Sequence, residues 1–366
     1  MVSVFSFVPI LVKIEKGSTP YHFLLKHMFY VLIGFAAMFF IHRKDPIIFS
    51  KYAKLALIVS IILLLYTMVF GTKVNDAGRW IKIPFIGLTF QSSDFAKLGL
   101  IIYLSKVLAK RKDDFKNWKS GFWNVIGPIA FVCILILKDN FSTAILLFMM
   151  CFILLFIGRY PIKKMLAAIG SGMAIALLLV GLHIALPSVN ILPRYETWKN
   201  RILNRMESDR NVLANAQSKN AELAIYNGGF IGQGVGDGKL KEYLPEAYAD
   251  FYYSSFVEEF GSLAAIGLIF IYALLMFRTI RIGLKSDKAF ETFLCVGIAI
   301  LLLTQATVNM MVCTGIFPVT GQNMPLLAMG GSALIMTCVS IGIIQSVASR
   351  LKNTENQSES ENSIEV

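Results

Sequence analysis

Long apolar runs alternate with short polar segments along almost the whole chain. Runs long enough to cross the roughly 30 Å hydrocarbon core of a bilayer fall near 22–41, 52–70, 94–109, 121–137, 140–158, 163–186, 255–277, 290–312 and 326–348. A shorter run over 1–12 lacks the basic start and the cleavage site of a signal peptide, so we expect a first helix whose beginning is very short or missing. The pattern predicts an all-α polytopic membrane protein, with about ten spans in one transmembrane domain.

Three segments of the chain differ from the short connectors. Residues 71–93 mix charged and aromatic side chains, as an interfacial segment does. Residues 187–254 form a long loop between the seventh and eighth spans, and a loop of that length usually carries function. The transmembrane domain is expected to end at residue 352, because residues 353–366 are polar and rich in Ser, Glu and Asn, which predicts a disordered tail.

Lysine and arginine residues gather in every second short loop, which orients the chain. The clusters lie in 43–54, 106–119, 159–164 and 278–288. Cations concentrate in cytoplasmic loops, so these segments should face the cytoplasm. With an even number of spans both termini are then cytoplasmic, and the long loop lies on the outer side.

Composition and charge agree with a membrane protein. The 366 residues are 56% hydrophobic and 16% charged, with a mean hydropathy of +0.64, more apolar surface than one soluble core could bury. The net charge of +12 comes from cations between apolar runs, so it indicates topology and no nucleic-acid partner. The five cysteines form no C-x-x-C pair and are expected to be packed core residues.

Few charged residues lie at the edges of the predicted spans, where a charge is costly and often functional. Asp94 and Lys97, near the start of the fourth span, are three residues apart and share a helix face, so they can form an ion pair. They could stabilise the structure alone or hold a charged ligand or a metal ion. Lys138, Asp139 and Asn140 interrupt an apolar run, either as a simple outer turn or as the lining of a polar cavity.

The second half of the long loop contains two further features. Six glycines within residues 228–238 suit either a flexible or re-entrant hairpin or a backbone that approaches a ligand closely. Asp250 follows, and Glu258 and Glu259 open the eighth span. A carboxylate at the edge of an apolar span is a candidate general base.

The motifs of this loop resemble those of the SEDS family of membrane proteins. Leu244–Phe251 and Glu258–Gly261 are similar to that family's Leu-Pro-Glu-x-x-x-Asp-Phe and Glu-Glu-Leu-Gly elements. Further similarities, in the family's order, lie in Arg79–Trp80, Gln91–Lys97, Ala224–Gly229, Gly232–Gly234, Phe317–Leu326 and Gly330–Ser332. The chain departs from the family's pattern at Ser92 (usually Pro), Asp94 (usually Glu), Asp139 (usually Pro) and Asn140 (usually Asp).

The resemblance implies a peptidoglycan glycosyltransferase of the bacterial inner membrane that polymerises lipid II. It also implies a class B penicillin-binding protein as partner, and Asp250 as the catalytic residue. Ala247, after the Pro-Glu pair, is closer to the division branch of the family than to the elongation branch. We therefore expect action at the division septum, beside other divisome membrane proteins and membrane lipid.

A mechanism follows as a hypothesis from this resemblance. Asp250 would remove the proton of a sugar 4-hydroxyl as that oxygen attacks a second lipid-linked sugar. The leaving pyrophosphate would be neutralised by Arg79, Lys97, Lys138 or a divalent cation, Mg²⁺ or Mn²⁺, held with Asp94. The other residues expected to contact substrate are Gln91, Asp139, Glu246, Thr320 and Gly321.

Three alternatives remain from the sequence. The first is a polymerase of the elongation branch, and the second is a lipid II flippase that breaks no bond. The third is a scaffold that recruits a partner through its spans. Transporters usually bind their substrates near the middle of the membrane. The densest polar motifs here lie in the outer loop instead, which favours an enzyme.

Overall fold

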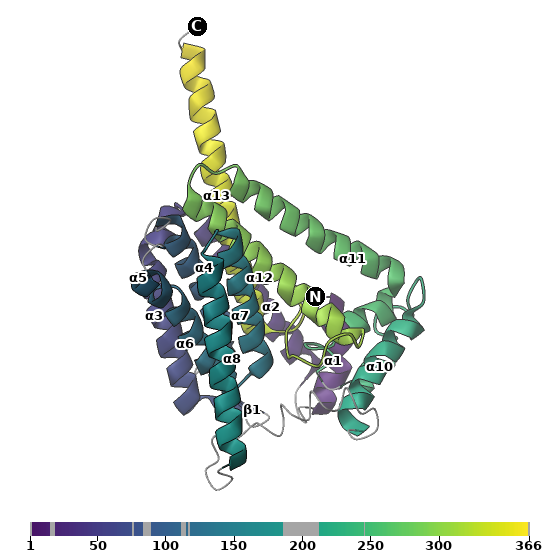
Figure 1. The fold of residues 1–366 in the computed structure, drawn as a ribbon. Coiled ribbons are helices and arrows are strands. Elements are labelled where there is room, and N and C mark those ends of the chain that lie inside the picture. The colour runs from purple at the N-terminus through teal and green to yellow at the C-terminus, as the bar shows by residue number, and fades with distance from the viewer. Residues whose placement is uncertain are drawn as a thin grey trace.

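The computed structural model describes residues 2–14, 19–74, 77–82, 89–110, 115, 118–185, 212–244 and 246–364. Within them the chain is mostly helical (Figure 1). The helices of the first half are α1 (Val2–Ile14), α2 (Pro20–His42), α3 (Ile47–Phe70), α4 (Ser92–Lys110), α5 (Trp118–Trp123), α6 (Ile126–Leu137), α7 (Phe141–Ile157) and α8 (Ile162–Ala185). Those of the second half are α10 (Val212–Gly228), the short 3₁₀ helix η2 (Leu240–Tyr243), α11 (Tyr252–Leu284), α12 (Ala289–Cys313) and α13 (Gly331–Ile364).

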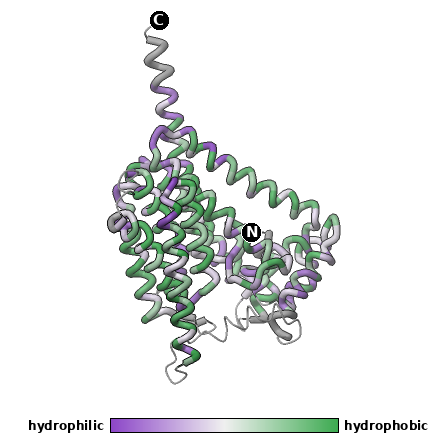
Figure 2. Tube along the Cα trace, in the orientation of Figure 1, coloured by the Kyte–Doolittle hydropathy of each residue, from purple (hydrophilic) through white to green (hydrophobic). Residues whose placement is uncertain are grey.

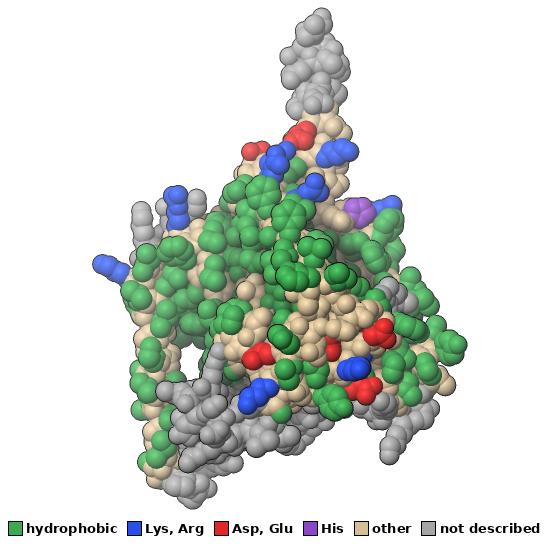
Figure 3. Space-filling view, turned by 90° about the vertical axis from the view of Figure 1, so that its right-hand side faces the viewer, with side chains coloured by type: hydrophobic (Ala, Val, Ile, Leu, Met, Phe, Trp, Pro, Cys, Tyr) green, Lys and Arg blue, Asp and Glu red, His purple; other side chains and the backbone are tan. Residues whose placement is uncertain are grey.

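Six of the described helices are long and apolar enough to cross a membrane: α2, α3, α8, α11, α12 and α13. Two shorter apolar helices, Gly121–Leu137 and Phe141–Ile157, accompany them. Hydrophobic residues predominate along the middle of the bundle (Figure 2), and Figure 3 shows apolar side chains covering that region with charged ones nearer its two ends. The predicted membrane class is therefore confirmed. The count of about ten spans is not, because α1 has only 13 residues and α4 carries four charged ones.

Small residues allow the central helices to approach closely. A methyl group added at Gly34 of α2 would lie 2.9 Å from Cys338 Sγ of α13, and one at Gly99 of α4 would lie 2.5 Å from Ser60 Oγ of α3. Small residues at helix contacts are typical of membrane bundles, where van der Waals packing replaces much of the hydrophobic driving force. The five cysteines are all buried, as predicted.

The segment after α3 forms a small sheet, which the all-α prediction missed. Strands β1 (Thr72–Val74), β2 (Ala77–Lys82) and β3 (Thr89–Gln91) are antiparallel in the order β1-β2-β3, with Trp80 paired to Gln91. The β-branched and aromatic residues of these strands favour extended structure. The sheet leads directly into α4, so it fixes where Asp94 and Lys97 begin.

Two further predictions differ from the structure. The segment 187–254 is not simply a loop, because α10 and η2 lie within it; residues 186–211 and 245 are outside the described part. The tail predicted as disordered is helical in the structure, since α13 continues to Ile364 and projects beyond the bundle (Figure 1). No Pro or Gly occurs after Gly342, so nothing in that sequence interrupts the helix.

The glycine-rich stretch packs against a break in α11. Gly261 has φ +81° inside that helix, and a methyl group there would lie 2.4 Å from the carbonyl oxygen of Phe230. Ser262 N donates to Gly229 O at 2.8 Å, and Gln233 N donates to Glu258 O at 2.9 Å. The glycines therefore allow close backbone contact with α11, and they form part of the support for the segment that carries Asp250.

Candidate active site

Asp250 ends a tight turn directly before α11. Its backbone N–H donates to Glu246 O at 3.0 Å, as that of Ala249 does at 2.9 Å. Glu246 has φ +57°, a left-handed conformation that is uncommon outside glycine. The turn leaves Asp250 half-buried, between fully buried Phe251 and the polar residues described next.

Asn309 of α12 holds this turn to a second loop. Its side-chain Nδ2 donates to the carbonyl oxygens of Asp250 at 3.0 Å and of Gln322 at 2.9 Å. Asn309 is only 1% exposed, so these hydrogen bonds form away from solvent. Met329 N also donates to Tyr248 O at 2.9 Å. The loop between α12 and α13 is thereby fixed to the turn of Asp250.

Gly321 brings that loop against the Asp250 carboxylate. A methyl group at Gly321 would lie 3.6 Å from Asp250 Oδ2 and 3.8 Å from Asn140 Nδ2. Asn140 caps α7, because its Oδ1 accepts from Thr143 N at 3.2 Å. Gln322 Nε2 donates to Thr143 Oγ1 at 2.7 Å. The turn before α11, the start of α7 and the loop between α12 and α13 thus meet around Asp250.

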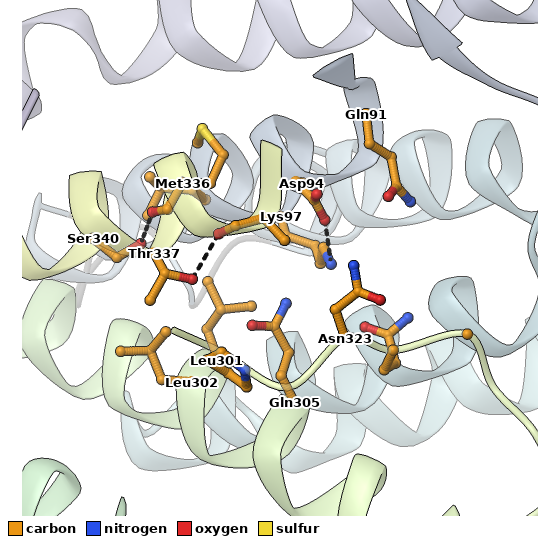
Figure 4. A pocket seen from close by; sticks show the side chains of 15 residues that line it. Gln91, Asp94, Lys97, Leu301, Leu302, Gln305, Asn323, Met336, Thr337 and Ser340 are labelled. Atoms are coloured by element: carbon orange, nitrogen blue, oxygen red, sulfur yellow. Dashed lines mark hydrogen bonds and ion pairs between the residues drawn. The ribbon is translucent and has the colours of Figure 1, made fainter. Parts of the chain in front are cut away.

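A small polar pocket is lined in part by the same loop (Figure 4). Asp94 and Lys97 form a buried ion pair in it, with 2.8 Å between Oδ1 and Nζ. Ser332 Oγ donates to Asp94 Oδ2 at 3.2 Å. The amide side chains of Gln91, Gln305 and Asn323 point towards the same space, and Gly321 also lines it, so pocket and carboxylate share one wall.

The interior of the pocket is about 30 Å³, and a single water molecule needs about 10–15 Å³ of such space. It cannot admit a disaccharide without opening. What it offers is a fixed positive charge on Lys97 beside several amide groups. Such groups stabilise negative charge that develops next to them.

The donor set around Asp94 does not fit a divalent cation. Both of its oxygens are engaged, one by Lys97 and one by Ser332. In the part of the chain that the structure describes, no three His, Cys, Asp or Glu residues gather as a metal site would require. The divalent cation stays a prediction from the sequence and enters no step below.

The remaining predicted residues lie at different depths around this site. Asp139 is half-buried and Lys138 exposed, beside buried Asn140 in the turn before α7. Glu246 is exposed. Thr320 is 5% exposed, and its hydroxyl has no hydrogen-bond partner among the described residues. Arg79 lies in β2, but its side chain is outside what the structure describes.

The structure adds five residues to the site: the sequence did not mark Asn309 and Gln305, and it marked Gln322, Asn323 and Ser332 only as parts of motifs. Asn309, Gln305, Gln322, Asn323 and Ser332 line the site or fix its loops. Asn309 and Gln305 are uncharged polar residues inside an apolar helix. Polar residues inside an apolar helix mark functional positions in membrane proteins. This pattern is the sequence signal from which Asn309 and Gln305 could have been found.

The fold and the site together define a multi-pass membrane protein with a polar, carboxylate-containing site at one end of its helix bundle. Residues 1–353 match the family of FtsW, RodA and SpoVE, described as cell cycle proteins. The chain belongs to this family, which confirms the resemblance seen in the sequence.

Curated relatives and solved structures agree with this assignment. The chain is 32% identical over 344 residues to the probable peptidoglycan glycosyltransferase FtsW of Geobacter sp. (strain M18), covering 92% of this chain and 90% of that one. It is also 32% identical over 340 residues to the protein of the same description in Trichlorobacter lovleyi, covering 90% and 84%.

Two solved structures share the fold at lower identity. One is a chain of a peptidoglycan synthase complex that coordinates polymerization and crosslinking, with a TM-score of 0.71, 23% identity and 96% of both chains covered. The other is the rod shape determining protein RodA of Thermus thermophilus, with a TM-score of 0.59, 21% identity and coverage of 94% and 93%.

Proposed function

We propose that this protein is a peptidoglycan glycosyltransferase that polymerises lipid II during cell division. The observation that carries the proposal is that Gly321 lies next to the Asp250 carboxylate and also lines the pocket that holds Lys97. A proton acceptor and a buried cation, both next to this loop, are the two groups that transfer from a pyrophosphate-linked sugar requires. Relatives described as FtsW support the assignment to division.

In the proposed step, the 4-hydroxyl oxygen of the acceptor sugar attacks the anomeric carbon of the donor sugar. The bond from that carbon to the pyrophosphate oxygen breaks, and undecaprenyl pyrophosphate leaves with the electron pair. Asp250 accepts the hydroxyl proton. The hydrogen bonds from Asn309 and the turn at Glu246 position Asp250 for this transfer.

The charge of the leaving pyrophosphate requires cations. Lys97 is held 2.8 Å from Asp94 and points into the pocket beside Gly321. Lys138 is exposed beside Asn140, whose amide would lie 3.8 Å from a methyl group at Gly321. We assign Lys97 and Lys138 to this role, together with Arg79. Gln91, Asp139, Glu246 and Thr320 are proposed to contact the substrate.

The proposed topology places this chemistry at the outer face. The helices α1, α4, α6 and α7 bring the six long spans to ten, both termini are cytoplasmic, and the turn of Asp250 lies outside. The basic residues of 43–54 and 278–288 support the orientation. The proposed partner is a class B penicillin-binding protein at the septum, alongside other divisome membrane proteins, and the likeness to a chain of a peptidoglycan synthase complex supports it.

The test is reconstitution of the protein with its partner and lipid II, followed by separation of glycan products by length. The proposal expects polymers that a muramidase digests, because new glycosidic bonds form. Movement of lipid II across the bilayer without polymer would contradict the proposal and identify a flippase.

A further inference from the structure

Three lysines line a pocket at the end of α4 that is remote from Asp94. They are Lys54 of α3 and Lys106 and Lys110 of α4, and Tyr103, Val107 and Asn124 complete the wall. Asp94 and Lys110 are sixteen residues apart on one helix, about 24 Å at 1.5 Å per residue. This lysine pocket and the site of Asp94 therefore lie near opposite faces of the membrane.

The pocket has a volume of about 330 Å³, far more than the roughly 10–15 Å³ that one water molecule needs. Tyr103 is only 8% exposed, and its hydroxyl donates to Asn124 O at 3.0 Å, which ties α4 to the start of α6. Val107 is also buried. The wall is therefore ordered even though Lys54 and Lys110 are exposed.

The charge inside this pocket is not balanced by the residues that line it. None of the six is acidic, and no hydrogen bond or ion pair joins the three ammonium groups to other described residues. The next acidic residues along the chain, Asp113 and Asp114, are outside the described part. Lys106 and Lys110 repel each other across one helical turn. An anion in the pocket would relieve that repulsion.

The neighbouring helix places the pocket at the depth of lipid headgroups. Trp118 and Trp123 of α5 are 53% and 69% exposed, and tryptophan is enriched at the boundary between membrane and water. Tyr160 donates to Gly121 O at 2.8 Å, and Lys164 donates to Phe115 O at 2.6 Å, so this region is anchored. Basic pockets between helices at that depth bind the phosphates of anionic lipids.

We propose that this pocket binds the headgroup phosphate of an anionic phospholipid in the leaflet opposite to Asp250. The three ammonium groups contact the phosphate oxygens, and the acyl chains extend along the apolar outer surfaces of α3 and α6. The lipid would fix α3 against α4, two helices of the central bundle.

The experiment uses the purified full chain in a neutral detergent, with phosphatidylglycerol as the probe and phosphatidylcholine as the zwitterionic comparison. Native mass spectrometry counts bound lipid, and the Tm reports stabilisation. Phosphatidylglycerol should bind in preference to phosphatidylcholine and raise the Tm of the protein. The affinity for phosphatidylglycerol should fall by about tenfold or more in a K54Q/K106Q variant, because each lysine near an anionic headgroup raises the affinity several-fold. The K54R/K106R variant keeps both charges and should retain binding.

The matched control is K44Q/K51Q, which removes two exposed cations of the same basic segment that do not line the pocket. An equal loss in this control would show general attraction to a positive surface and overturn the proposal. Equal binding of the two lipids would also overturn it. Displacement of the lipid by millimolar inorganic phosphate would assign the pocket to a soluble phosphate compound instead. Variants are compared by their lipid-free Tm, and a single K106Q replaces any double variant that does not fold.

Discussion

The Asp250 site is held together mainly by contacts that involve backbone groups, and less by pairs of side chains. Asn309 donates to carbonyl oxygens of two loops, and the Gly321 backbone approaches the Asp250 carboxylate. Gly321 has φ +69°, which costs about 1–2 kcal/mol for a residue with a Cβ atom. A side chain there is both strained and close to the proton acceptor.

Gly321→Ala is predicted to lower polymerisation by more than its effect on stability explains. The added methyl group would lie 3.6 Å from Asp250 Oδ2, where the acceptor hydroxyl must approach. The control is Gly229→Ala, since Gly229 has φ +52° and no atom within 4 Å of an added methyl group. Both variants should lose about 1–2 kcal/mol of stability, measured by thermal unfolding. Equal activity in the two would contradict the role of Gly321.

The residues of this site could be predicted from the sequence only where a motif or a charge marked them. Asp94, Lys97 and Asp250 were found in that way. Asn309 and Gln305 were missed, because a neutral side chain inside an apolar helix shows its function only when distant loops or helices come together. The sequence marked Asn140 as part of an outer turn or a polar cavity, at a position where the family usually has Asp, but its place beside Gly321 depends on the tertiary fold.

At the scale of elements, Lys241 of η2 joins four segments. Its Nζ donates to Ser6 Oγ of α1 at 2.7 Å, Gly236 O at 2.8 Å and Glu259 Oε1 of α11 at 2.7 Å. Lys241 and Glu259 are both about 5% exposed. This cluster connects the N-terminal helix to the segment just before the turn of Asp250.

Lys241→Met is predicted to destabilise the protein by about 3–5 kcal/mol, because Glu259 would stay buried beside the Ser6 hydroxyl without its cationic partner. A K241M/E259L double variant should recover much of that loss, since it buries no unpaired charge. The measurement is the Tm in detergent. The control is Lys285→Met, which breaks an exposed 3.6 Å pair with Glu355 and should cost at most about 1 kcal/mol. Similar losses in K241M and K285M would refute the structural role of Lys241.

Helices were more predictable than the segments between them. The apolar runs near 22–41 and 290–312 became α2 and α12 with similar bounds, because apolar length alone defines a span. The three-stranded sheet depends on pairing between distant positions such as Trp80 and Gln91, which hydropathy does not reveal. The helical tail was missed because its polar composition was taken as disorder, although it contains no helix breaker.

Across the whole molecule, the proposed topology places the Asp250 turn and the basic loops on opposite sides of the membrane. The native cysteines are all buried, so background labelling should be low. A cysteine at Ile231, which is 87% exposed, should react with a membrane-impermeant maleimide added outside intact spheroplasts. A cysteine at Asp287, in the basic loop after α11, should react only after lysis. The reverse pattern would show that the orientation is inverted.

In the proposed mechanism the Asp250 carboxylate accepts the proton of the attacking sugar, and Asp250→Asn tests this step. The substitution keeps size and removes the base, so polymerisation of lipid II by the purified protein with its partner should fall by about a hundredfold or more. Asp237→Asn, the same change at an exposed position of the outer segment, should leave the rate unchanged. Glycan chains formed by D250N at the wild-type rate would contradict the account.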